Sequence, residues 1–230
     1  MFSISSNKLT SATLLLVIGL FISFYPLQAQ TEAQTQESPA PAEVVAPAIK
    51  LVEGKDYVTK FPNEQSKKPM IVEFFSYMCQ HCYNFETTVK LWEKQKPESV
   101  ELLRIPVSFG RDQWRLAAKS YYIAEELKLV DQFSKVIFKK IHIERKPPRK
   151  LKDIEQLFAT IGVDNKAFKN AANSFNVDSK IRKADFLTKK FKVSGVPYFL
   201  INFKYEVGKE NYSSQEGLFK VWNNLPAIDF

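Results

Sequence analysis

The chain contains two cysteines, Cys79 and Cys82, separated by Gln80 and His81. They directly follow the apolar run of residues 71–75, which is typical of a buried strand. A disulfide across so short a loop constrains the unfolded chain little, which disfavours an inert structural role. The pair can open and close instead, so this spacing predicts a thiol–disulfide redox site.

The segment after the strand predicts that the two sulfurs differ. Three apolar residues follow Cys82 at spacings of three and four: Phe85, Val89 and Trp92. A helix beginning near Cys79 therefore places Cys82 on its core-facing side and leaves Cys79 at the exposed tip. Unpaired N–H groups and the helix dipole favour a Cys79 thiolate there, and a protonated His81 adds to this effect. The alternative for His81 is a solvated residue without a role.

A metal site and haem attachment are competing uses of two close cysteines. Zinc needs four ligands, and the only histidines are His81 and His142, the latter in a basic segment with helical character. Haem attachment requires a histidine directly after the second cysteine, where this chain has Tyr83. We therefore expect neither a metal nor an organic cofactor.

Residues 1–29 predict a cleaved secretory signal, because Lys8 precedes an apolar stretch that Pro26 and Ala29 follow. The stretch is shorter than the roughly 20 residues that span a bilayer, which disfavours an uncleaved anchor. Export leads to an oxidising compartment, where a disulfide persists. Residues 30–48 are rich in Gln, Glu, Ala and Pro and predict a disordered spacer; the alternative is a segment that folds against a partner or mediates dimerisation.

Strands are expected at residues 52–59, 70–76, 102–107, 198–203 and 205–207. Between the third and the fourth, apolar residues recur at helical spacing, including a core stripe that ends at Phe175. Asp131, Asp164 and Asp178 are placed as helix N-caps or first-turn acids. The pattern predicts an α/β chain whose strands flank an all-helical insertion.

The composition permits one medium-sized domain, since 45% of the 230 residues are hydrophobic. The net charge is +8, and residues 49–230 carry +10, because the preceding part holds one lysine and three glutamates. The densest basic cluster straddles Pro147 and Pro148 and lacks aromatic residues for stacking on bases. We expect a helix end and a solvated loop there, not a nucleic-acid interface.

Residues 71–86, IVEFFSYMCQHCYNFE, resemble the active-site segment of the DsbA family of periplasmic thiol:disulfide oxidants. The similarity extends from about residue 51 to the C-terminus through the stretches LVEGKDY, LRIPVSF, SGVPYFLIN and FKYEV. It implies a thioredoxin fold built from residues 49–110 and 191–230, with a helical domain of residues 111–190 inserted. It also implies a periplasmic location.

Matched by position, the resemblance implies that Cys79 is the exposed nucleophile, Cys82 the buried resolving cysteine and His81 a stabiliser of the Cys79 thiolate. Val196 and Pro197 match the family's cis-proline loop, whereas sequence alone favours a trans proline that opens a strand. An extended substrate is expected to pair with the Val196 main chain beside Pro197 and Gln80.

Glu73 is a carboxylate within an apolar strand. Apolar surroundings raise the pKa of a carboxyl group, which suits a proton donor or acceptor for Cys82. The family pairs such an acid with a base on the next strand, which corresponds to Arg104 here. The alternatives are a partly exposed Glu73 and an Arg104 that is a plain surface charge.

The chain departs from the family pattern at two places. Gln80 stands where the best-known motif has proline, which leaves the strength of the oxidant open. Asn202 is followed by Phe203 where glycine is common, so we expect a longer or different turn, because phenylalanine is a poor residue for a positive φ.

We therefore predict an exported oxidase that donates its Cys79–Cys82 disulfide to unfolded or newly exported cysteine-containing proteins. The resemblance implies reoxidation by a DsbB-like membrane quinone reductase. Two alternatives stay open: a disulfide isomerase or reductase of the same fold, and a redox-silent chaperone-like protein that binds through the groove around Pro197.

Overall fold

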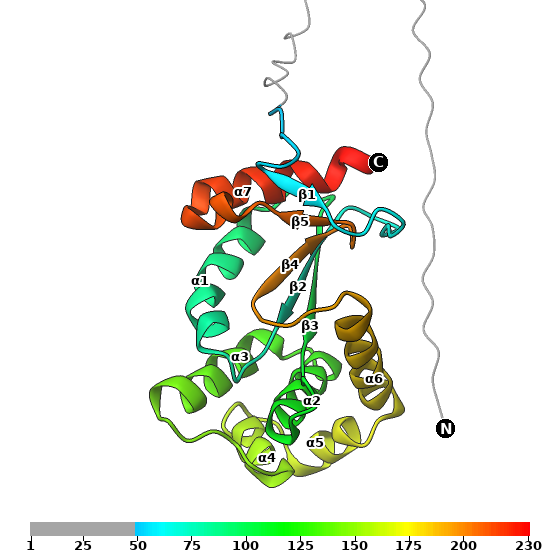
Figure 1. Ribbon diagram of the computed structural model, residues 1–230. Helices are drawn as coiled ribbons and strands as arrows, with labels where there is room; N and C mark the ends of the chain where they lie inside the picture. Colours follow the sequence, from blue (N-terminus) through cyan, green and yellow to red (C-terminus); the bar gives the residue numbers. More distant parts are fainter. Residues whose placement is uncertain (1–48) are drawn as a thin grey trace, which may run out of the picture. The chain divides into compact units, whose positions relative to one another are not determined.

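The computed structural model describes residues 49–230, so the predicted signal (1–29) and spacer (30–48) lie outside the described residues. Within that range, no helix combines the length and apolar character that a membrane crossing requires. Five strands form one mixed sheet in the order β1-β5-β4-β2-β3 (Figure 1). Their bounds are Tyr57–Thr59 (β1), Met70–Phe75 (β2), Glu101–Pro106 (β3), Tyr198–Ile201 (β4) and Tyr205–Val207 (β5).

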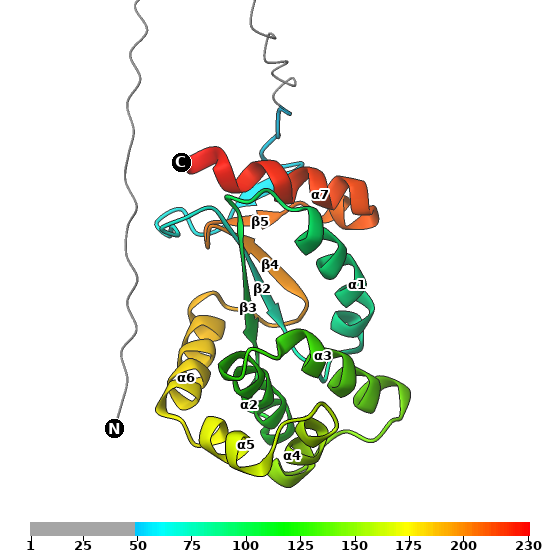
Figure 2. The same cartoon turned by 180° about the vertical axis from the view of Figure 1, so that it is seen from behind.

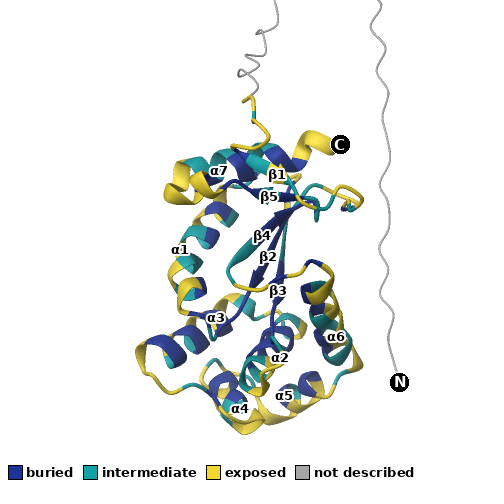
Figure 3. Cartoon of the chain, in the orientation of Figure 1, coloured by how far each residue is buried: buried dark blue, intermediate teal, exposed yellow. Residues whose placement is uncertain are grey.

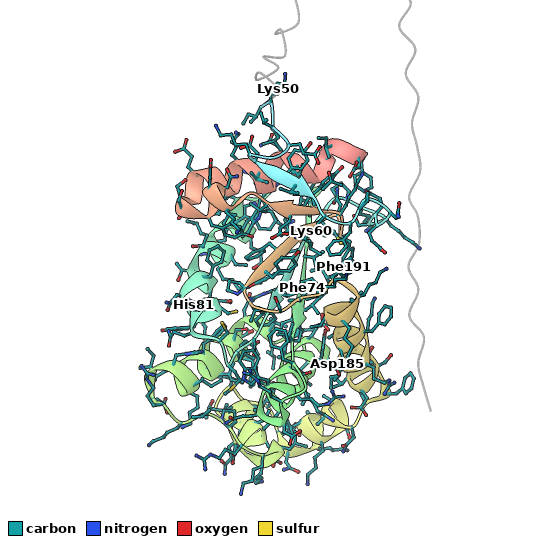
Figure 4. The ribbon with its side chains drawn as sticks, in the orientation of Figure 1. Lys50, Lys60, Phe74, His81, Asp185 and Phe191 are labelled. Carbon is teal, nitrogen blue, oxygen red and sulfur yellow. The ribbon has the colours of Figure 1, made fainter. Side chains whose placement is uncertain are left out.

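Strand β2 is the centre of the sheet, paired parallel with β3 and antiparallel with β4. After the partly buried Met70, the apolar residues of the strand are fully buried on both faces, which explains why the sequence there is apolar at every position but Glu73. On one face, Ile71 packs in a cluster with residues of α1 (Gln80–Gln95) and α7 (Gln215–Asn224). On the other, Phe74 lies against Phe191, just beyond the end of α6 (Phe175–Lys190). Figure 4 labels both rings of this contact.

The remaining helices lie between β3 and β4, as predicted, and together with α6 gather at one end of the sheet (Figures 1 and 2). They are α2 (Asp112–Glu126), α3 (Val130–Phe138), α4 (Leu151–Ala159) and α5 (Asn165–Ala172), with a π-helical turn at Lys139–Ile143. Short 3-10 helices lie at Lys209–Ser213 and Leu225–Asp229. The predicted acids are confirmed: Asp131 and Asp178 occupy first turns, and Asp164 caps α5 by accepting from the Ala167 N–H at 2.8 Å.

The helical segment has its own buried centre and is also attached to the sheet. Phe133 of α3 stacks on Phe158 of α4 with ring centroids 4.0 Å apart. Figure 3 shows the inward faces of these helices buried and their outer faces exposed. The Ser108 hydroxyl, beyond β3, donates to Asp185 of α6 at 2.7 Å. This contact joins α6 to the chain as it leaves the sheet.

Two element predictions are wrong. The strand expected at 52–59 is limited to Tyr57–Thr59, because the chain turns at Gly54, whose φ is +86°. The Asp56 carboxylate accepts from the Val52 N–H at 2.8 Å and holds this turn in place. Phe175, expected in the core, is 80% exposed, because it is the first residue of α6 and lies outside the buried stripe.

The turn after β4 is longer than a two-residue turn, as expected, because residues 202–204 separate the paired Ile201 and Tyr205, but its backbone differs from expectation. Strand β4 ends at Ile201, and the Lys204 N–H donates to the Ile201 carbonyl at 2.9 Å. Asn202 and Phe203 both have a positive φ, of 55° and 62°, so the expectation that Phe203 avoids this region is wrong. Phe203 stacks on Phe191 with ring centroids 5.1 Å apart, and this packing compensates for the unfavourable backbone.

Candidate active site

Helix α1 begins where the sequence predicted, directly after Cys79. Cys79 is the N-cap residue, with an extended backbone (φ −94°, ψ 122°), and its Sγ accepts from the Cys82 N–H at 3.4 Å. The Cys79 N–H donates to the Ser76 carbonyl at 3.0 Å, which fixes the loop between β2 and the helix. The first sulfur therefore lies at the end of a helix where N–H groups are available to it.

Cys82 is more buried than Cys79, as expected, but the difference in exposure between the two residues is smaller than expected. Cys82 is 1% exposed on the core side of α1, as predicted. Cys79 is only 9% exposed, so the expectation of an exposed tip is wrong. The loop before β4 accounts for this, because the Val196 carbonyl lies 3.3 Å from the Cys79 Sγ. The Val196–Pro197 peptide bond in this loop is cis.

Cys79 and Cys82 are free thiols in this structure, and their surroundings give them different pKa values. The pKa of Cys79 falls to about 6, chiefly because the Cys82 thiol donates a hydrogen bond to it. The backbone N–H groups of Cys82 and His81 and the charge of His81 lower it further, against an opposing effect of burial. The same hydrogen bond and burial raise the pKa of Cys82. At neutral pH the arrangement favours one thiolate, on Cys79.

The two residues between the cysteines point away from the core. His81 is exposed, and Figure 4 shows it at the N-terminal end of α1. Gln80 is exposed as well, and its Nε2 donates to Asn84 Oδ1 at 3.0 Å.

Glu73 and Arg104 form a buried ion pair beneath the helix. Arg104 Nε donates to Glu73 Oε2 at 2.6 Å, and the two side chains are 4% and 1% exposed, so both surface alternatives are wrong. Desolvation raises the pKa of Glu73, although the charge of Arg104 opposes the shift. The Glu73 charge in turn raises the pKa of Cys82, which places the carboxyl group within electrostatic reach of the buried sulfur.

Sequence reasoning missed the third member of this group. Arg104 also donates to Glu86 on α1, from Nη2 at 2.6 Å and from Nη1 at 3.2 Å. Two carboxylates thus share one guanidinium, and Glu86 contributes to the raised pKa of Glu73. The signal was available, because Glu86 lies four residues after Cys82 and hence on the same side of α1.

His142 is the other residue that the sequence did not place at the site. Its side chain is buried in the π-helical turn, and Nε2 lies 2.8 Å from the Tyr77 carbonyl oxygen. No local pattern could have indicated this contact, because the two residues are 65 positions apart.

Comparison with known proteins agrees with this site. The family model described as a DSBA-like thioredoxin domain matches residues 70–217. The thiol:disulfide interchange protein DsbA of Burkholderia cepacia is 33% identical, with 95% of each chain covered. The DsbA of Azotobacter vinelandii is also 33% identical, over 80% of this chain and 86% of that protein.

Solved structures show the same fold. The crystal structure of Pseudomonas aeruginosa DsbA has a TM-score of 0.67 and 29% identity, and covers 78% of this chain and 94% of that one. A Proteus DsbA variant solved with the non-covalently bound peptide PWATCDS has a TM-score of 0.70 and 28% identity, over 77% and 99% of the two chains. The chain therefore has the thioredoxin fold with a helical insertion, and it belongs to the DSBA-like thioredoxin domain family of thiol:disulfide oxidoreductases.

Proposed function

We propose that the chain acts as an oxidase that transfers the Cys79–Cys82 disulfide to unfolded, newly exported proteins, with Cys79 as the reacting sulfur. The supporting observation is the difference between the two sulfurs. Cys79 has a pKa of about 6, whereas burial and its hydrogen bond raise the pKa of Cys82. A group that stabilises the Cys79 thiolate stabilises the reduced form of the pair, and this makes the disulfide a stronger oxidant.

The transfer takes two displacements. A client thiolate attacks the Cys79 sulfur, the Cys79–Cys82 bond breaks, and Cys82 leaves as a thiolate that takes up a proton. A second client thiolate then attacks the client sulfur of the mixed disulfide and expels the Cys79 thiolate. The client gains a disulfide and the enzyme gains two electrons and is left reduced.

Glu73 is proposed to exchange the proton of Cys82. A carboxyl group with a raised pKa binds a proton more readily than an ordinary carboxyl group and can exchange it with a thiolate within reach. The electrostatic effect of Glu73 on Cys82 and its fixed contact with Arg104 support this role. His81 is proposed to act on the other sulfur, through its charge.

The client is proposed to bind as an extended segment along the main chain of Val196, beside Pro197 and Gln80. The position of the Val196 carbonyl, 3.3 Å from the reacting sulfur, supports this docking site. The peptide held by the Proteus relative is consistent with such a mode.

The same proposal includes export through a signal at residues 1–29, a spacer at residues 30–48 and a periplasmic location. Reoxidation requires an electron acceptor, for which a membrane quinone reductase of the DsbB type is proposed. The division of the folded part into a thioredoxin-like domain (residues 49–110 and 191–230) and a helical insertion (residues 111–190) stays a prediction.

The function is tested by mixing the oxidised protein with a reduced, unfolded protein that has several cysteines. Wild type should form client disulfides stoichiometrically, whereas Cys79→Ala should form none. The equilibrium with glutathione gives the direction of transfer. A reducing potential close to that of thioredoxin, about −270 mV, would contradict the oxidase assignment and favour a reductase.

A further inference from the structure

The imidazole of His142 contacts the loop that carries Cys79 on both sides of that residue. Nε2 lies 2.8 Å from the Tyr77 carbonyl oxygen, and Nδ1 lies 3.1 Å from Gln80 Oε1. The ring stacks on Tyr83 of α1, with centroids 5.0 Å apart and planes 10° from parallel. A single buried side chain from the helical segment therefore joins the residues before and after the nucleophile.

Two hydrogen-bonding arrangements satisfy all these groups. The Tyr77 carbonyl only accepts, so Nε2 carries a proton in both. A charged His142 donates from Nδ1 to Gln80 Oε1. A neutral His142 accepts from Gln80 Nε2 once the Gln80 amide is rotated by half a turn; the Asn84 amide is then rotated as well, so that its Nδ2 donates to Gln80 Oε1. Burial lowers the pKa of His142, which favours the neutral arrangement. The contact with Gln80 is present in either case.

The contact concerns the part of α1 that stabilises the thiolate. The N–H groups of His81 and Cys82 that lower the pKa of Cys79 belong to this first turn, and Gln80 is its first residue. The Cys82 N–H is already 3.4 Å from Sγ, so a small displacement of the turn would weaken the interaction. Glutamine lacks the ring that restricts a proline backbone, and its side-chain contact with His142 can restrict the turn instead.

We propose that His142 is a positioning residue, which, through Tyr77 and Gln80, holds the first turn of α1 in the geometry that stabilises the Cys79 thiolate. The inference rests on the proposed redox function of Cys79. It assigns part of the oxidising strength of the site to a residue of the helical segment.

The test uses the variants Gln80→Leu, His142→Phe and the double variant, each on the full chain. Phenylalanine keeps the stacking on Tyr83 but removes both hydrogen bonds. Each single variant should raise the pKa of Cys79, measured by thiolate ultraviolet absorbance. Gln80→Leu should weaken oxidation in the glutathione equilibrium about 3- to 10-fold, the effect of one net hydrogen bond, and His142→Phe, which removes two, should weaken it at least as much. The double variant should show less than the product of the two effects, since the residues act as one unit.

Lys140→Gln is the matched control, because Lys140 lies in the same π-helical turn and pairs only with Glu144 among the described residues. It should leave both readouts unchanged. Gln80 is exposed, so Gln80→Leu keeps the test decisive if His142→Phe does not fold. Two results would overturn the positioning role while leaving the proposed function in place, provided that the wild type is active. One is that Gln80→Leu and His142→Phe leave both readouts unchanged. The other is that the effects of the two substitutions are independent of each other. A wild type that exchanges no disulfide with glutathione would overturn the proposed function as well.

Discussion

At the scale of single residues, the site works through hydrogen bonds that distinguish two chemically identical thiols. Cys79 receives a hydrogen bond from the Cys82 thiol and lies at the helix terminus, whereas Cys82 is buried next to the charge of Glu73. Each contact favours one protonation state of one sulfur. The contributions of the Cys82, His81 and Glu73 side chains can be separated experimentally, because each is removed by a different substitution.

The thiolate of Cys79 should titrate with an apparent pKa of about 6 in the reduced protein, followed by ultraviolet absorbance against pH. Cys82→Ala should move this midpoint upward more than His81→Ala, because the Cys82 hydrogen bond is the larger influence and the His81 charge the smallest. A midpoint near that of free cysteine, about 8.5, would refute the assignment.

Glu73→Gln should slow reactions in which Cys82 gains or loses a proton about 10-fold or more, because general acid–base groups contribute at least that much. Stopped-flow reaction of the reduced variant with oxidised glutathione measures this rate. The titration of Cys79 should stay unchanged. Glu86→Gln is the matched comparison, since it also removes one carboxylate from Arg104 yet leaves Glu73 in place. Equal slowing by both variants would point to the ion pair and not to proton transfer.

At the scale of elements, the turn after β4 connects three parts of the fold through one side chain. Asn202 is fully buried, and its Oδ1 accepts from the Met70 N–H at 2.9 Å. Its Nδ2 donates to the Pro226 carbonyl at 2.8 Å. The sheet, the turn and the C-terminal segment therefore depend on a single amide.

Asn202→Gly should lower the free energy of unfolding by about 2–4 kcal/mol, because it leaves a buried donor and acceptor unpaired. Glycine accepts the φ of 55°, so this variant isolates the side-chain effect from backbone strain. Denaturant unfolding measures the change. The exposed Asn173→Ala serves as control and should cost less than about 0.5 kcal/mol. A small loss for Asn202→Gly would show that water replaces the amide.

These elements also show how far the sequence alone leads. The apolar run of β2, the periodic helices and the start of α1 follow from local patterns, which depend on neighbouring residues. The positive φ of Phe203 does not, because its compensation comes from Phe191, a residue of another element. The same holds for the site: Cys79 and Cys82 are only three positions apart, whereas the contacts of His142 and the pairing of Glu86 with Arg104 exist only after folding. The proximity of Val196 to Cys79 was implied by the family resemblance but by no local pattern, and the degree to which this loop buries the sulfur was not predicted.

At the scale of the whole molecule, redox state and stability are linked. The folded protein lowers the pKa of Cys79 from 9.0 to about 6, so folding favours the thiolate form of the reduced pair. A disulfide across two intervening residues restricts the unfolded chain by about 2 kcal/mol in the loop-closure model. The thiolate contributes more than this once the pH is about 8 or higher, because each unit of pKa shift corresponds to about 1.4 kcal/mol. The oxidised protein should therefore be the less stable form at such a pH.

The denaturant midpoint at pH 8 should rise when reductant is added. For the reduced protein, the contribution of Cys79 is complete above about pH 9 and is lost as the pH falls through about 6, because its folded pKa is the lower one. This rise should accordingly be lost at pH 5. A Cys79→Ala, Cys82→Ala double variant should show no response to reductant. Equal midpoints for oxidised and reduced wild type at pH 8 would contradict this linkage.

The concealment of Cys82, which is 1% exposed, restricts which covalent intermediates can form. Under the proposed function, every encounter with a client should produce the same mixed disulfide, joined through Cys79. The inner sulfur then always faces that bond and can release a slow client by attacking it. Mixed disulfides between a client and Cys82 should therefore not accumulate. An unproductive encounter is reversible, and the enzyme returns to its oxidised form.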